Sequence, residues 1–263
     1  MGIFDTHAHY LKDDFGEELD GLLAELPQMG VERVLAVGCN LESSREEIAL
    51  AERYGYIKAA AGIHPEHAAK LPADWEKQLE EMLRNEQVCA LGEIGLDYHY
   101  PEPPRELQRE IFERQLIMAK RLDMAVIIHS RDACDDTMRL LREYKPRGVL
   151  HCFSGSAETA REAVALGLYI GFTGVLTFKN AKKTVAACEA VPLDRLLLET
   201  DCPYMAPEPF RGQKSHSGMI ARTAAKMAEI KGVSAEEMTE TARLNGERLF
   251  GLLAEWRDDS QQV

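Results

Sequence analysis

The amino-acid sequence predicts a single-domain (β/α)8 barrel, a TIM barrel of the α/β class. The first observation behind this prediction is length, since 263 residues suit one barrel of about 250 residues without a second domain. The second is an alternation of short apolar stretches with helix-like stretches along almost the whole chain. The third is an even composition, with 45% hydrophobic residues and no low-complexity or linker-like segment. We expect the barrel to occupy residues 1–257 and a short tail to occupy residues 258–263.

Eight strand-like stretches are almost uninterrupted in apolar residues, as buried parallel strands are. In chain order they are Ile3–Thr6, Val31–Val37, Ile57–Gly62, Val88–Leu91, Ala125–Ile128, Gly148–Leu150, Leu168–Phe172 and Leu196–Leu198. The alternative to a closed barrel is an open doubly wound sheet, which usually carries a glycine-rich phosphate loop after its first strand. Here His7-Ala8-His9 follows the first strand instead, so the barrel is favoured.

A helix-like stretch follows almost every one of these strands, and leucines at helical spacing mark the first stretch. Ser43 and Asp74 are the expected N-caps of the second and third helices. The expected helices between strands are Glu17–Met29, Ser43–Tyr54, Asp74–Glu86, Arg105–Leu122, Cys134–Glu143, Ser156–Leu166 and Ala181–Ala190. Two further helices, near His216–Ile230 and Ser234–Leu252, are expected after the eighth strand.

Composition narrows the class of protein. No apolar run approaches the roughly 18 residues of a membrane-spanning helix, and the N-terminus lacks the basic and apolar regions of a secretory signal. The six cysteines are scattered without a Cys-x-x-Cys pair, which indicates reduced thiols in a cytoplasmic protein. A net charge of −13 argues against a broad nucleic-acid-binding face, so any nucleic acid would be held locally by a metal and a few cations. We expect a monomer with no membrane partner.

Side chains that can bind metal ions stand at the ends of the predicted strands. Because all strands of a barrel point the same way, their C-terminal ends meet at one mouth, where active sites of this fold lie. His7 and His9 are two residues apart, a spacing that places both imidazoles on one face of a strand. The other residues at strand ends are His64, Glu93, His129, His151 and Asp201.

Each of these residues also has a purely structural interpretation. An isolated His129 or His151 after an apolar strand is more often a core histidine than a ligand, and Asp201 could cap a turn before Pro203. Glu93 could be a buried carboxylate paired to a cation, but no Lys or Arg lies within five residues of it. An unpaired buried charge is costly, so the convergence of the whole set favours a metal centre.

The donor types indicate which ions are expected. Histidines and carboxylates together form a borderline nitrogen and oxygen site that suits Zn, Mn, Ni or Fe and can accept Mg. Six ligands exceed the needs of one catalytic ion, so we expect two divalent metal ions with one bridging carboxylate. Such a pair can generate hydroxide at neutral pH and stabilise both the attacking and the leaving oxygen. The expected metal ligands are His7, His9, Glu93, His129, His151 and Asp201.

The sequence resembles the TatD family of metal-dependent deoxyribonucleases, within the amidohydrolase-like barrels. The similarity runs in order from residue 4 to about residue 212. The matching stretches are Phe4-Asp5-Thr6-His7-Ala8-His9, Gly62-Ile63-His64-Pro65, Gly92-Glu93-Ile94-Gly95-Leu96-Asp97-Tyr98, Ile128-His129-Ser130-Arg131, His151-Cys152-Phe153-Ser154-Gly155, Phe172-Thr173-Gly174-Val175 and Leu198-Glu199-Thr200-Asp201-Cys202-Pro203-Tyr204.

The resemblance implies a role for each residue of the site. One ion would be held by His7, His9, Glu93 and Asp201, and the other by Glu93, His129 and His151. Glu93 would bridge the ions, where many related barrels use a carbamylated lysine. Asp201 would also orient the nucleophilic water and take its proton, so Asp201 and Glu93 are the expected catalytic residues.

The resemblance also implies a substrate side lined by His64, Arg131 and Arg211. Arginine suits bidentate contact with phosphate, although Arg131 could instead pair with Asp132 or Asp135. The loop after Asp201 departs from the family's commoner Arg-Gly-Lys-Arg-Asn form. It reads Arg211-Gly212-Gln213-Lys214-Ser215-His216.

The expected activity is hydrolysis of a phosphodiester in DNA, starting from an exposed 3′ end of a single strand. An acidic protein with a compact cationic mouth suits such ends better than long duplex. One alternative keeps the barrel but changes the bond, as in an amidohydrolase, an esterase or a D-aminoacyl-tRNA deacylase. The other is a structural metal site in a binding module, which would be closed by protein ligands alone.

Overall fold

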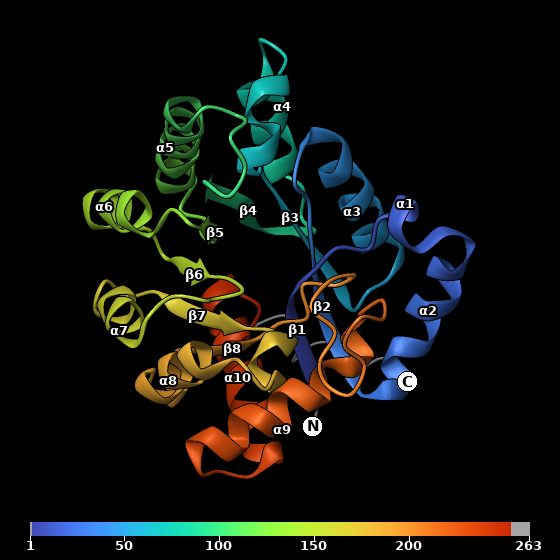
Figure 1. Cartoon of the computed structure of the whole chain (residues 1–263). Helices are drawn as coiled ribbons and strands as arrows, with labels where there is room; N and C mark the ends of the chain where they lie inside the picture. The colour runs from blue at the N-terminus through green and yellow to red at the C-terminus, as the bar shows by residue number, and fades with distance from the viewer. Residues whose placement is uncertain (1, 254–263) are drawn as a thin grey trace.

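The computed structural model describes residues 2–253 of the chain. Eight parallel strands form the wall of a barrel. The strands lie in the order β1 to β8, and a bridge between Ala8 and Cys202 joins the two edges of the sheet. At this seam His9 N–H donates to the carbonyl of Cys202 at 2.8 Å, and Asp201 N–H donates to the carbonyl of His7 at 2.9 Å. Figure 1 shows the helices arranged around the outside of the strands. The predicted (β/α)8 barrel is therefore confirmed.

The strands begin close to the predicted positions, but the first, fourth and fifth continue beyond their predicted ends. Their bounds are β1 Ile3–Ala8, β2 Val31–Val37, β3 Ile57–Ala61, β4 Val88–Asp97, β5 Ala125–Arg131, β6 Gly148–Leu150, β7 Tyr169–Phe172 and β8 Leu196–Leu198. The pairing of β4 with β5 continues to Asp97 and Arg131, well beyond the apolar residues of either strand. Glu93 and His129 therefore lie within strands rather than after them.

The helices occupy the predicted stretches of sequence. Their bounds are α1 Lys12–Phe15, α2 Leu19–Glu25, α3 Leu41–Arg53, α4 Trp75–Leu83, α5 Arg105–Leu122, α6 Cys134–Tyr144, α7 Ala157–Ala165, α8 Lys182–Ala190, α9 Ile220–Lys231 and α10 Ala235–Phe250. Short 3-10 helices cover Gly16–Glu18, Leu26–Met29, Pro65–Lys70, Gly174–Thr177, Leu193–Arg195 and Ser217–Met219. Among residues 2–253, no helix combines the length and the apolar character needed to cross a membrane.

Two predicted details of the helices are wrong. The continuous helix predicted over 17–29 is broken, and α2 ends at Glu25 because Pro27 cannot continue an α-helix and starts a 3-10 turn. The N-cap of α3 is Asn40, whose side chain accepts from Ser43 N–H, so Ser43 is the third residue of a capping box. Asp74 is the N-cap residue of α4 as predicted, although its carboxylate accepts from the Gln78 side chain and makes no capping hydrogen bond.

Apolar side chains fill the barrel and the layer between the strands and helices. Phe4, Leu35 and Val37 belong to the inner cluster, together with residues at the end of α10. The ring of Phe250 packs edge-on against Phe4, with 6.2 Å between ring centroids. Burying each large apolar side chain contributes about 1.5–3 kcal/mol, so this core makes a rigid support for the strand ends. The expected tail, residues 258–263, and the expected end of the barrel at residue 257 lie outside the described residues.

Candidate metal centre

The structure brings all six side chains predicted as metal ligands to the C-terminal end of the barrel. They come from the first, fourth, fifth, sixth and eighth strands or from the residues directly after them. Backbone hydrogen bonds fix two of these positions: Glu93 N–H donates to the carbonyl of Gly38, the residue after β2, at 2.9 Å, and His151 N–H donates to Ile128 of the neighbouring β5 at 3.1 Å. Distant segments of the chain thus meet because the strands are adjacent in the barrel.

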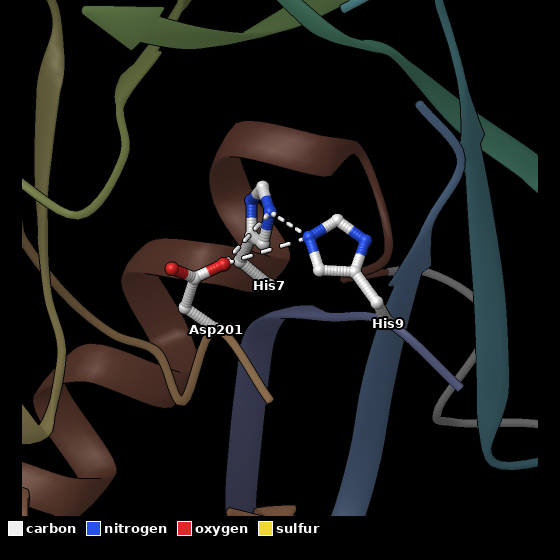
Figure 2. Close-up of side chains that lie close together, drawn as sticks. All are labelled: His7, His9 and Asp201. Carbon is white, nitrogen blue, oxygen red and sulfur yellow. Dashed lines mark hydrogen bonds and ion pairs between the residues drawn. The ribbon is translucent and has the colours of Figure 1, made fainter. Parts of the chain in front are cut away.

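One group of donor atoms consists of His7, His9 and Asp201, whose side chains point toward one another (Figure 2). The two Nε2 atoms are 3.1 Å apart, and Asp201 Oδ1 is 3.8 Å from that of His7 and 3.5 Å from that of His9. Glu93 Oε2 lies next to the two histidines, at 3.5 Å from His7 Nε2 and 3.7 Å from His9 Nε2. His7, His9 and Asp201 therefore enclose one small volume, and an oxygen of Glu93 lies beside its two histidines.

The other carboxylate oxygen of Glu93 faces a second group. Glu93 Oε1 lies 2.6 Å from His151 Nε2 and 2.9 Å from His129 Nδ1, and these two nitrogens are 3.3 Å apart. His64 Nε2 lies 3.7 Å from the same oxygen. Glu93 thus stands between the two groups and presents one oxygen to each.

A glycine makes this approach of β4 to β5 possible. Gly95 lies between Glu93 and Asp97 and has a φ of +143°, which side-chain-bearing residues rarely adopt. A Cβ at this position would lie 2.0 Å from the carbonyl oxygen of His129. The lack of a side chain therefore lets β4 place Glu93 and Asp97 on either side of His129.

The charges of the centre keep both carboxylates ionised. Burial would raise the pKa of Glu93, but the charge of His151 and hydrogen bonds from His129 and His151 hold it well below its usual value. Burial would likewise raise the pKa of Asp201, which a hydrogen bond from His9 and the neighbouring histidine charges lower. Both groups are therefore available as anionic ligands at neutral pH.

The pKa values of the histidines shift in opposite directions. Burial, aided by the charge of His151, lowers the pKa of His7 to about 4, and burial lowers that of His64 to about 3. Burial acts the same way on His129, but hydrogen bonds to Asp97 and Glu93 outweigh it and raise the pKa to about 9. His7 is thus ready to donate a lone pair at neutral pH, whereas His129 must first lose a proton.

These donors fit divalent metal ions. Atoms bonded at about 2.0–2.1 Å to one tetrahedral ion lie roughly 3.3 Å from each other, a geometric consequence of the bond lengths of zinc sites. The distances of the His7 and His9 Nε2 atoms from each other and from the carboxylates of Glu93 and Asp201 run from 3.1 to 3.8 Å, which matches that spacing. A buried set of imidazoles and carboxylates facing one another is the donor chemistry that zinc, manganese or nickel accepts.

The three residues predicted on the substrate side lie in two different settings. His64 is buried with the donor groups, and its Nδ1 accepts from Glu66 N–H, which turns Nε2 toward Glu93. Arg131 and Arg211 are exposed instead. Their guanidinium groups lie over the rings of Tyr100 at 5.5 Å and Phe178 at 4.2 Å.

Arg131 is the last residue of β5, and the alternative pairing with Asp132 is not formed. Asp132 pairs with His99 instead, at 3.1 Å. Arg131 nevertheless lies near the centre, because its charge is among the influences that lower the pKa of Asp97.

Three residues at the centre were missing from the sequence-based prediction. Cys39 Sγ lies 3.7 Å from Glu93 Oε2, and Glu199 Oε2 lies 4.0 Å from His151 Nδ1. Asp97 Oδ2 lies 3.0 Å from His129 Nε2. Only Asp97 had a usable signal, since it is four residues from Glu93 and alternate residues of a strand share a face.

This protein is a closed (β/α)8 barrel with histidines and carboxylates gathered at its mouth. These two features are typical of barrel hydrolases that depend on metal ions. Comparison with known proteins narrows this class. The family model described as TatD related DNase matches residues 4–251. The chain therefore belongs to the TatD family of metal-dependent hydrolases.

Individual relatives cover nearly the whole chain. The uncharacterized metal-dependent hydrolase YabD of Bacillus subtilis (strain 168) is 38% identical over 251 residues, which span 94% of this chain and 98% of YabD. The uncharacterized metal-dependent hydrolase YcfH of Escherichia coli (strain K12) is 38% identical over 256 residues, or 95% of this chain and 96% of YcfH. The crystal structure of YjjV, a TatD homologue from Escherichia coli K12, has a TM-score of 0.88 at 36% identity and covers 95% of this chain and 98% of its own.

Proposed function

We propose that this protein is a deoxyribonuclease that hydrolyses phosphodiester bonds from the 3′ ends of single-stranded DNA. The observation that carries the proposal is the position of Glu93, which presents one carboxylate oxygen to each of two donor groups. Two metal ions bridged by a carboxylate are the arrangement that many phosphodiester-cleaving enzymes use. The description of the matching family as TatD related DNase supports the same bond type.

In this proposal His7, His9, Glu93 and Asp201 would hold the first ion, and Glu93, His129 and His151 would hold the second. Zinc, manganese, nickel and magnesium are the candidate ions, given the mixed nitrogen and oxygen donors. When bound, such a pair would lower the pKa of a water molecule and neutralise charge that develops on the phosphoryl oxygens.

The protein's own residues would position the water and the substrate. Asp201 is held in the left-handed backbone conformation, with a φ of 57°, by the hydrogen bond from its N–H to His7. This places an ionised carboxylate at the edge of the donor group, where it would orient the attacking water and accept its proton. His64, Arg131 and Arg211 would bind the scissile phosphate or its neighbour.

The rim of the barrel offers surfaces on which bases can stack. Tyr100 and Tyr204 are 50% and 57% exposed, unusually high for large aromatic side chains. Tyr204 N–H donates to the carbonyl of Asp201 at 2.9 Å, which ties this tyrosine to the donor groups. Exposed aromatic rings beside arginines bind single-stranded nucleic acid with little sequence preference, which suits the proposed substrate.

We propose that the enzyme acts as a monomer in the cytoplasm. All the donor atoms of both groups come from one chain, so a partner subunit is not needed to complete the centre. The six cysteines are free thiols, a state that a reducing compartment maintains.

A substrate panel tests the proposed activity. A 5′-labelled single-stranded oligonucleotide should shorten progressively from its 3′ end, and a phosphorothioate block at that end should stop the shortening. Chelation should abolish the reaction, and Glu93→Ala should do the same while the exposed control Glu25→Ala stays active. Persistent cleavage by Glu93→Ala would count against the proposal. Hydrolysis of acyl esters or D-aminoacyl-tRNA without oligonucleotide cleavage would favour the alternative reaction on the same barrel.

A further inference from the structure

We propose that Asp97 is a positioning residue that fixes which ring nitrogen of His129 faces the metal centre. The proposal rests on the metal-binding role proposed above for His129. An imidazole has two nitrogens, and a hydrogen bond at one of them decides which is free to bind an ion. The structure shows such a bond: His129 Nε2–H donates to Asp97 Oδ2 at 3.0 Å, and the opposite atom, Nδ1, lies 2.9 Å from Glu93 Oε1.

Asp97 is itself held firmly. It is buried at the end of β4, and its second carboxylate oxygen, Oδ1, accepts from His99 N–H at 2.9 Å. Its backbone N–H donates to Gln108 Oε1 at 2.9 Å, and Gln108 Nε2 donates back to the carbonyl of Asp97 at 2.8 Å. Gln108 is buried and lies on α5, so this helix anchors the carboxylate that orients His129.

The use of both oxygens as acceptors makes the carboxylate hard to replace. An asparagine at position 97 has one oxygen and one NH2 group. If the oxygen keeps the bond from His99 N–H, the NH2 group faces His129 Nε2 and requires that nitrogen to be unprotonated. The proton then moves to Nδ1, the atom that faces Glu93. If the amide turns round, its NH2 group meets His99 N–H and the backbone bond is lost.

A comparable aspartate elsewhere in the chain provides the control. Asp132 Oδ2 accepts from His99 Nδ1 at 3.1 Å, so this pair repeats the chemistry of Asp97 and His129. Both partners are exposed, and neither belongs to the donor groups. Asp132→Asn therefore removes a carboxylate beside a histidine without touching the centre.

The first test uses the wild-type protein loaded with zinc. Nitrogen-15 NMR of the histidine rings should show His129 protonated at Nε2 and metal-bound through Nδ1. The reverse assignment would overturn the proposal without the need for any variant.

The second test measures zinc binding by chelator competition together with metal content. Asp97→Asn should lower the zinc affinity of one of the two sites by about 10–100-fold, the usual effect of removing the hydrogen-bond partner of a metal ligand. The zinc affinity of the other site should not change. Asp132→Asn should bind zinc at both sites as the wild type does. Circular dichroism and thermal unfolding check that the variant folds. If folded Asp97→Asn binds both ions as the wild type does, Asp97 does not position His129. If wild-type protein binds fewer than two ions, the proposed two-metal function fails instead, so the two failures are distinguishable.

Discussion

The carboxylate of Glu93 lies 2.6 Å from Nε2 of His151 through one oxygen, while its other oxygen faces a separate pair of histidines. These contacts join segments that are far apart in the chain, since β4, β6 and β1 meet only because the barrel closes. A buried carboxylate shared between two groups of imidazoles is costly without cations and well suited to them.

Replacement of Asp201 by asparagine should lower kcat more than it raises KM. The amide keeps the size of the side chain and an oxygen that can face the ion, but it cannot accept the proton of the attacking water. Loss of a general base typically costs about 10²–10⁴-fold in rate. Steady-state kinetics on a short single-stranded oligonucleotide, with metal content measured in parallel, check this expectation. An unchanged kcat in metal-replete Asp201→Asn would contradict the assigned role.

The exposed arginines should affect substrate binding rather than the chemical step. We expect Arg131→Ala and Arg211→Ala each to raise KM for oligonucleotides by roughly 10-fold or more, since hydrogen bonds to charged groups contribute about 1.5–3 kcal/mol. The salt dependence of binding should also become less steep, by about 0.7 in the log–log slope for each lost phosphate contact on a single strand. Arg142→Ala, an exposed arginine on α6 paired with Glu162, is the control. Equal KM values in all three variants would remove the arginines from the substrate site.

Tyr204 should distinguish long substrates from small ones. Replacement by alanine removes a stacking surface that contributes about 1–3 kcal/mol per base, so affinity for an oligonucleotide should fall by roughly 5–150-fold. Hydrolysis of a small aryl phosphodiester, which has no neighbouring base, should be little changed. Tyr204→Phe keeps the ring and should retain the affinity of the wild type. If Tyr204→Ala impaired the hydrolysis of both substrates equally, Tyr204 would support the metal centre and would not bind bases.

Glu47 should make the protein less stable as pH rises. Burial raises its pKa to about 8 from 4.5, which the charge of His9 and a hydrogen bond from Tyr10 N–H only partly oppose. The folded state therefore binds the proton more tightly than the unfolded state. Its contribution to stability is fully present below pH 4.5 and is lost as pH rises toward 8, by at most about 1.4 kcal/mol per pH unit.

Glu47→Gln resembles the protonated form and should remove this part of the pH dependence. Urea unfolding at pH 5 and pH 8 provides the free energies of unfolding to compare. The exposed neighbour Glu46→Gln serves as the control and should leave the slope as in the wild type. Identical slopes for Glu47→Gln and the wild type would show that Glu47 is ionised in the folded protein.

Much of this architecture could be predicted because it follows from local patterns. Apolar stretches of strand length identified all eight strands, and the gathering of strand ends at one mouth placed Glu93 near His129 and His151. The lengths of β4 and β5 could not be read in this way, because their continuation to Asp97 and Arg131 depends on hydrogen bonds between the two strands. The α3 cap was misplaced by three residues because Asn40 and Ser43 both have capping side chains and act as one box.

The outer residues of the centre were harder to predict than the donors. Cys39 reaches Glu93 because Glu93 N–H donates to the carbonyl of Gly38, the residue before Cys39, and Glu199 reaches His151 where the ends of the sixth and eighth strands approach each other. Neither contact leaves a spacing in the sequence that a motif could reveal. Asp97 shares a strand face with Glu93, so its place could be predicted, but its hydrogen bond to His129 could not.

The most direct test of the two-ion centre is anomalous diffraction from crystals grown with manganese or zinc. Our account predicts two anomalous peaks, one on each side of the Glu93 carboxylate, separated by about 3.5–4 Å as in known two-metal sites. One peak should lie among His7, His9 and Asp201, and the other beside His129 and His151. A single peak, or two peaks that both lie away from Glu93, would contradict the account.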